Sequence, residues 1–107
     1  MDTAVQNELE KLTELIINTI PVEQIYLFGS HAYGTPDKNS DLDLYVVLKD
    51  DVQMRLIDAI IKIRHAIGRK KTMPVDILVN TVSRYRERIQ GPTIERTINR
   101  DGIKIYG

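Results

Sequence analysis

Three acidic residues are the side chains of this sequence best suited to chemistry. Asp41 and Asp43 stand two positions apart in DLDLYVVL, a run that predicts a β-strand. Residues i and i+2 of a strand point to the same side, about 7 Å apart, so these two carboxylates could share one cation or hold two. Oxygen ligands of this kind suit Mg²⁺ or Mn²⁺. For this pair alone, two solvated acids at the start of a strand is the simpler interpretation.

A third acid, Asp76, lies inside the otherwise apolar run VDILV. An acid in such a run is costly to bury without a partner. Asp76 could pair with a nearby Lys or Arg, or it could complete a three-carboxylate site with Asp41 and Asp43 on a neighbouring strand. Two metal ions held there would stabilise the attacking and the leaving oxygen of an in-line phosphoryl or nucleotidyl transfer.

Gly29 and Ser30 follow a short apolar run and precede the paired acids by one loop. A strand that ends in Gly-Ser lets backbone N–H groups approach an anion closely, and the serine adds a hydroxyl donor. If Ser30 begins a helical turn, the helix N-terminus adds further donors for a phosphate. Gly-Ser alone is usually just a loop, so its interest here is its position.

The elements that must hold these residues follow from periodicity and from Gly and Pro. They predict an α/β (or α+β) fold, a single domain over 1–107 in which helices cover a small mixed sheet. Asp50 or Asp51 is expected to cap the helix at 51–67, and Gly68 is expected to end it with a positive φ. The expected elements, in chain order, are a helix at 5–20, a strand at 24–28, a loop at 29–40, a strand at 41–48, a helix at 51–67, a strand at 75–79, helices at 83–90 and 93–100, and a strand at 103–106.

Composition excludes several classes of protein. The chain has 107 residues, 15 Lys and Arg against 15 Asp and Glu, and no cysteine. The absence of cysteine excludes a disulfide scaffold and a thiolate zinc site and fits a reducing compartment, so we expect a cytoplasmic protein. No apolar run approaches the length of a membrane span, and the neutral charge argues against stable binding of long nucleic acid.

Gly29-Ser30, ten intervening residues and then Asp41-x-Asp43 resemble the G-S-x10-D-x-D motif of the polymerase-beta-like nucleotidyltransferase superfamily. Asp76 on a later strand is similar to the third carboxylate of that superfamily. The short chain resembles the minimal nucleotidyltransferases. The match in order and spacing covers about half the chain. Many members have Arg where this sequence has Tyr33, which leaves the detailed phosphate contacts open.

This resemblance implies transfer of a nucleoside monophosphate from a nucleoside triphosphate, AMP from ATP in the first instance, to a hydroxyl. It implies that Asp41 and Asp43 bind two Mg²⁺ or Mn²⁺ ions, and that Asp76 binds one of them and favours deprotonation of the acceptor. Gly29 and Ser30 would hold the β- and γ-phosphates.

The resemblance also implies a partner. Minimal nucleotidyltransferases often pair with a HEPN-domain protein in toxin–antitoxin modules, and there the transferase is the antitoxin that adenylylates a tyrosine of the toxin. We expect the same here, since few residues follow the third predicted strand. The alternatives are a non-catalytic module that neutralises a partner by covering its surface, and a transferase for a small molecule such as an antibiotic.

Several other residues have no role that the sequence can decide. His31 beside Ser30 could act as a base, although a metal and Asp76 already suffice. The basic segment 84–88 could contact a partner, but its helical spacing spreads over several faces. Tyr33, Tyr45, Tyr85 and Tyr106 could each stack on a base or pack in the core.

Overall fold

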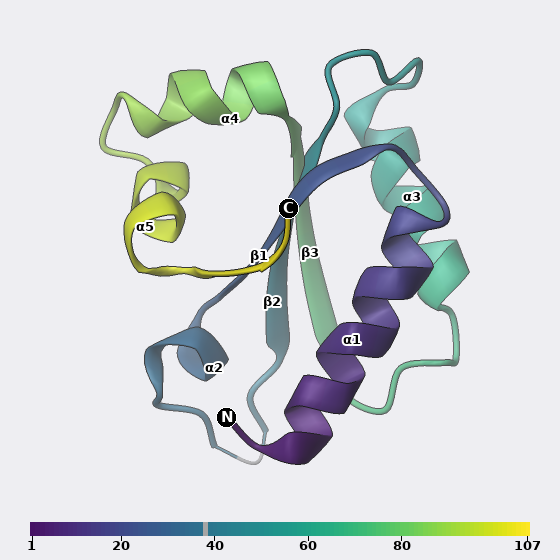
Figure 1. Ribbon diagram of the computed structural model, residues 1–107, viewed down its shortest axis with the longest axis vertical. Helices are drawn as coiled ribbons and strands as arrows, with labels where there is room; N and C mark the ends of the chain where they lie inside the picture. The colour runs from purple at the N-terminus through teal and green to yellow at the C-terminus, as the bar shows by residue number, and fades with distance from the viewer. Residues whose placement is uncertain (38) are drawn as a thin grey trace.

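In a computed structural model, which describes residues 1–37 and 39–107, helices lie on both faces of a four-stranded mixed sheet (Figure 1). The strand order is β3-β2-β1-β4; β1 pairs antiparallel with β2 and β4, and β2 pairs parallel with β3. This is the fold class that the sequence predicts. The elements, in chain order, are α1 (Thr3–Ile17), β1 (Val22–Phe28), α2 (Ser30–Tyr33), β2 (Leu42–Leu48), α3 (Leu56–Ile67), β3 (Val75–Thr81), α4 (Val82–Ile89), α5 (Ile94–Asp101) and β4 (Ile103–Tyr106).

The two faces of the sheet bury different side chains. One face packs against α1 and α3 and forms an aliphatic core, to which β2 contributes every second residue from Leu42 to Leu48. The other face carries Asp43 and Asp76, and we call it the site face. There α4 and α5 cover a smaller cluster around three tyrosines, Tyr26, Tyr45 and Tyr85. Figure 1 shows α1 and α3 on one side of the strands and α2, α4 and α5 on the other.

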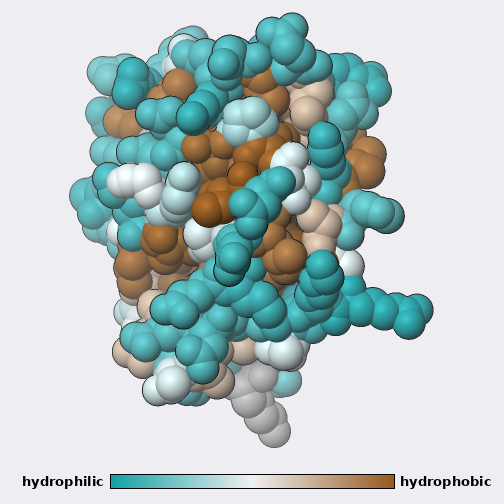
Figure 2. Space-filling model, turned by 45° about the vertical axis from the view of Figure 1, so that its right-hand side comes forward, coloured by the Kyte–Doolittle hydropathy of each residue, from teal (hydrophilic) through white to brown (hydrophobic). Residues whose placement is uncertain are grey.

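The outer surface of the α1–α3 layer is partly apolar. Ile57 and Ile61, four residues apart on α3, are both more than half exposed. Figure 2, which turns this layer toward the viewer, shows apolar surface between polar side chains. No helix in the described part of the chain is long and apolar enough to cross a membrane.

The predicted start of α3 is wrong. The helix begins at Leu56 rather than at residue 51, and Arg55 is its N-cap without a side-chain capping bond. Neither Asp50 nor Asp51 caps α3, because both lie in a turn several residues before the helix begins. Asp50 instead accepts hydrogen bonds from the backbone N–H (3.0 Å) and the hydroxyl of Ser83 at the start of α4. Gly68 does end α3 with a positive φ of 47°, as predicted.

The expected loop at 29–40 contains the short helix α2, and its residue Lys38 lies outside the described residues. The strand predicted at 75–79 continues to Thr81, whose hydroxyl accepts from the N–H of Arg84 and so caps α4. A strand that passes directly into a capped helix leaves no loop for a sequence pattern to detect.

Candidate functional site

Strand register brings the predicted residues to one end of the site face. Phe28, the last residue of β1, is opposite Asp43 on β2, and Asp43 is opposite Asp76 on β3. Neighbouring strands lie about 4.8 Å apart, so Phe28, Asp43 and Asp76 lie side by side on three adjacent strands, and Gly29 directly follows Phe28. Asp41 immediately precedes β2. The structure thus brings all the predicted residues into one region, from segments far apart in the chain.

Gly29 is fixed by two separate requirements. Its φ is +75°, a conformation that L side chains rarely adopt, and a Cβ placed on it would overlap Oδ2 of Asp43. The carboxylate of Asp43 therefore lies directly over the Gly29 backbone, where no side chain fits. The end of the strand and Asp43 are therefore in contact.

Ser30 begins α2, as the anion-binding hypothesis requires. The N–H groups of Ala32 and Tyr33 donate to the carbonyl of Gly29, which leaves the preceding amides outside the internal bonding of this one-turn helix. Gly34 ends the helix with a φ of +78°. Tyr33 is exposed, so it is available to solvent or to a partner.

Negative charge is concentrated at Asp43. Burial raises the pKa of Asp43, and the negative charges of Asp76 and Asp41 raise this pKa further; His31 acts in the opposite direction. A carboxylate perturbed in this way by two other carboxylates marks a region of excess negative potential. Such a region attracts cations.

The concern that Asp76 is buried in an apolar strand does not hold. Along β3, Val75 and Ile77 are buried in the aliphatic core, whereas Asp76 faces the site side and is exposed. In the described residues, Asp76 has no ion pair with a Lys or Arg. These residues also contain no cluster of three or more Asp, Glu or His side chains close enough together to hold a metal ion. Register aligns Asp43 with Asp76, and Asp41 directly precedes β2, but the three side chains do not converge.

His31, on α2, contacts the segment that leads into β2. Its Nε2 lies 3.2 Å from the carbonyl oxygen of Ser40, the residue before Asp41. The imidazole thus ties α2 to the start of β2. It also lines a cavity of about 480 Å³ between α1, α2 and β4, which contains none of the three acids.

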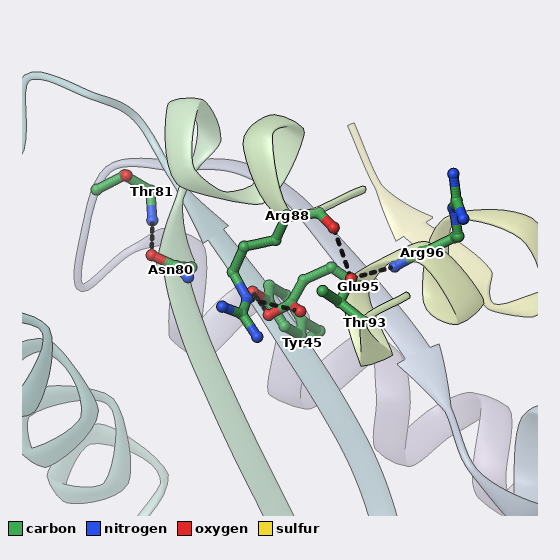
Figure 3. A network of polar contacts seen from close by, with 7 residues as sticks. All are labelled: Tyr45, Asn80, Thr81, Arg88, Thr93, Glu95 and Arg96. Carbon is green, nitrogen blue, oxygen red and sulfur yellow. Dashed lines mark hydrogen bonds and ion pairs between the residues drawn. The ribbon is translucent and has the colours of Figure 1, made fainter. Parts of the chain in front are cut away.

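A polar network that the sequence did not reveal lies on the part of the site face that α4 and α5 cover (Figure 3). The hydroxyl of Tyr45 donates to the buried carboxylate of Glu95 (2.7 Å), and Nε of Arg88 donates to the same carboxylate (2.9 Å). Burial raises the pKa of Glu95, but the bonds from Tyr45 and Arg88 outweigh it and hold the net pKa below its usual value. Tyr45 and Tyr85 are core residues rather than exposed stacking surfaces. No local pattern around Glu95 could have predicted a partner 50 positions away.

A smaller cavity adjoins this network. It measures about 250 Å³ and is lined by Asn80 at the end of β3 and by Arg84, Glu87 and Arg88 on one side of α4. Arg84, Glu87 and Arg88 share that side because positions three and four apart on a helix are neighbours. The basic segment therefore does present a defined surface, which its sequence spacing alone did not show.

Comparison with known proteins agrees with this geometry. The nucleotidyltransferase domain family matches residues 7–105. Among characterised proteins, the chain is similar to the protein adenylyltransferase MntA of Shewanella oneidensis (strain MR-1), with 44% identity over 41 residues. That stretch is 37% of this chain and spans only 30% of the length of MntA.

Solved structures share the fold. A toxin–antitoxin complex with AMP-PNP contains a chain that matches with a TM-score of 0.58 at 23% identity, over 92% of this chain and 73% of that one. A nucleotidyltransferase structure from Sulfolobus solfataricus has a TM-score of 0.58 at 21% identity, over 97% and 86% of the two chains. A mutant of the toxin–antitoxin complex MntA–HpeT has a TM-score of 0.56 at 19% identity, over 92% and 72%.

These structural likenesses are of fold alone, but the domain family covers nearly the whole chain, and its fold is the one described above. This chain belongs to the nucleotidyltransferase domain family.

Proposed function

We propose that this chain is a metal-dependent nucleotidyltransferase that moves AMP from ATP to a hydroxyl of a partner HEPN-domain toxin, and so acts as the antitoxin of a pair. The observation that carries the proposal is the register of three strands, which places Asp43 opposite Asp76 and opposite Phe28, the residue before Gly29. Family membership supplies the reaction class.

The residues fit a divalent cation by their donor chemistry. Asp41, Asp43 and Asp76 offer only carboxylate oxygens, which suit Mg²⁺ or Mn²⁺ rather than softer metals. The pKa of Asp43, raised by burial and then by the two other acids, indicates the excess negative potential that a cation relieves. When bound, two such ions would offset the charge that develops on the transferring phosphoryl group. Asp41 and Asp43 would hold both, and Asp76 would hold one.

The chain's own groups would position the reactants. The backbone amides at Gly29 and Ser30, with the Ser30 hydroxyl, would bind the β- and γ-phosphates. In the transfer, the acceptor oxygen forms a bond to the α-phosphorus, and the bond from that phosphorus to the bridging oxygen of the β-phosphate breaks. Pyrophosphate leaves with those electrons, and the carboxylate of Asp76 favours loss of the acceptor proton.

The choice of a protein acceptor rests on likeness. The relative MntA is named as a protein adenylyltransferase, and two of the similar structures are toxin–antitoxin complexes, one with AMP-PNP. We extend these properties to the present chain: ATP as the nucleotide substrate, a toxin as the partner and a tyrosine hydroxyl as the acceptor.

The test is to incubate the chain with ATP, Mg²⁺ and the HEPN-domain protein encoded beside it, and to analyse both proteins by mass spectrometry. We expect one or more AMP groups on the partner, and none when Asp41→Ala and Asp43→Ala are combined in a variant that circular dichroism shows to be folded. A folded wild-type chain that adds no mass to the partner would contradict the transfer. A double variant that still neutralises the toxin would favour a steric antitoxin instead.

A further inference from the structure

In the proposed reaction, the leaving group and the acceptor lie over different strands of the sheet. In-line transfer requires the leaving pyrophosphate and the attacking hydroxyl to lie on opposite sides of the α-phosphorus. The phosphate-binding residues Gly29 and Ser30 follow β1, the paired acids are on β2, and Asp76 is on β3. The leaving group therefore lies toward β1, and the acceptor must approach over β3.

The acceptor side of the sheet is accessible. Within the described residues, β3 is an edge strand, with β2 on one side and no strand on the other. Side chains alternate along β3, so Asp76, Leu78 and Asn80 all face the site side. Leu78 is 40% exposed, although it is large and apolar. An incoming segment that reaches Asp76 would thus pass over Leu78.

The cavity lined by Asn80, Arg84, Glu87 and Arg88 lies at the opposite end of β3 from Asp76. Asn80 is four positions along β3 from Asp76, a distance of about 13 Å along the strand. Arg88 already donates to Glu95 through Nε. By contrast, the guanidinium of Arg84 has no hydrogen bond or ion pair to any described residue, and it is exposed.

We propose that Leu78 and this cavity form the acceptor-docking track, and that Arg84 binds a carboxylate of the acceptor polypeptide about four residues from the hydroxyl that receives AMP. This inference rests on the proposed function. Charge complementarity supports a carboxylate, because the planar fork of an unpaired arginine matches it in a bidentate way. Glu87 and the Asn80 side chain offer acceptors for the backbone N–H groups of the same segment. Asn80 lines the same cavity as Arg84, and its separation of about 13 Å from Asp76 along β3 equals about four residues of extended chain.

The experiment measures the affinity of the wild-type chain for three short fluorescent peptides by anisotropy. Each peptide has one tyrosine. The three sequences are identical except at the two positions about four residues before and after that tyrosine, where they carry Glu, Gln or Lys. We expect the Glu peptide to bind about tenfold more tightly than the Lys peptide, a ratio in the range of a charge-assisted hydrogen bond. Arg84→Glu should reverse this order. Arg86→Glu, on the same helix but outside the cavity, should retain the wild-type order.

A parallel titration with ATP and Mg²⁺ on the same samples separates this inference from the proposed function. Equal affinity for the three peptides, or no binding of any, overturns the docking track even if the chain binds MgATP. An unchanged order in Arg84→Glu also overturns it. Absence of metal-dependent ATP binding contradicts the proposed function, whatever the peptides do.

The transfer assay gives a second readout. Arg84→Glu should raise the KM for the acceptor protein about tenfold and leave the KM for ATP unchanged, as expected for a residue that contacts only the acceptor. A rise in the KM for ATP would place Arg84 beside the nucleotide and overturn the assignment.

Discussion

At the scale of single residues, the site depends on a close approach of backbone and carboxylate. Gly29 ends one strand and Asp43 lies on the next, yet the carboxylate of Asp43 occupies the space that a Gly29 side chain would need. A glycine at position 29 is therefore required by the position of Asp43 as well as by its own positive φ. This contact makes the metal-binding and phosphate-binding halves of the proposed site one unit.

Gly29→Ala should therefore abolish MgATP binding. The new methyl group would displace the carboxylate of Asp43, and the φ of +75° with a ψ of −161° would add a cost of about 1–3 kcal/mol to folding. Gly34→Ala is the control for a positive φ without a clash, because Gly34 has a φ of +78° but no atom within 4 Å of the position that an added Cβ would take. Urea unfolding should show that both variants are folded and that Gly29→Ala is the less stable of the two, and only Gly29→Ala should lose MgATP binding in calorimetry. Equal MgATP affinities in the two variants would refute the contact's role.

At the scale of elements, α4 and α5 are attached to the sheet by the carboxylate of Glu95. It is 5% exposed and accepts from Tyr45 on β2 and from Arg88 on α4. The ring of Tyr85 on α4 packs on those of Tyr26 and Tyr45, with centroids 5.6 and 5.2 Å apart. This cluster fixes α4, and therefore Arg84 and the cavity, relative to β3.

Replacing Glu95 with Gln should lower the free energy of unfolding by about 1–3 kcal/mol at neutral pH, because a charge-assisted pair is lost in a buried position. The net pKa of Glu95 lies below its usual value of 4.5 when the chain is folded. Its stabilising effect is therefore complete above that value and is lost as the pH falls through the lower, folded pKa. Urea unfolding should show that the difference in the free energy of unfolding between wild type and variant becomes smaller as the pH falls from 7 to about 3. A difference that stays constant with pH would mean that the charge of the carboxylate contributes nothing to stability.

Sequence patterns predicted the elements better than the contacts between them. Alternation in β2 correctly assigned Leu42 and Leu44 to the core and Asp43 to the other face, because strand period depends only on local geometry. The cap predicted at Asp50 was wrong, and that side chain instead bonds to Ser83, a residue 33 positions away that no local pattern connects to it. The Glu95 network was missed for the same reason. Motif spacing singled out Asp41 and Asp43, and the acid in an apolar run singled out Asp76; register places Asp43 opposite Asp76. The position of Arg84, by contrast, depends on the packing of α4.

At the scale of the whole molecule, the two ends of the site face differ in what lies on them. Figure 1 shows α2 at one end and α4 and α5 at the other. Asp43 contacts Gly29 before α2, so the acids lie at the α2 end. Between the two ends the edge strand β3 stays accessible at Asp76 and Leu78. The opposite face is filled by α1 and α3, so a bound nucleotide and an acceptor must share the site face. The arrangement suits a reaction between two reactants that approach over β1 and over β3.

We propose that residues on three adjacent strands form one metal–nucleotide site, and calorimetric titration of ATP measures binding at that site. The wild-type chain should bind ATP in the presence of Mg²⁺ or Mn²⁺ and lose most of that affinity when the metal is removed with a chelator. A folded chain that carries both Asp41→Ala and Asp43→Ala should show no metal-dependent binding. ATP affinity that is indifferent to metal, or that survives in the double variant, would contradict the claim.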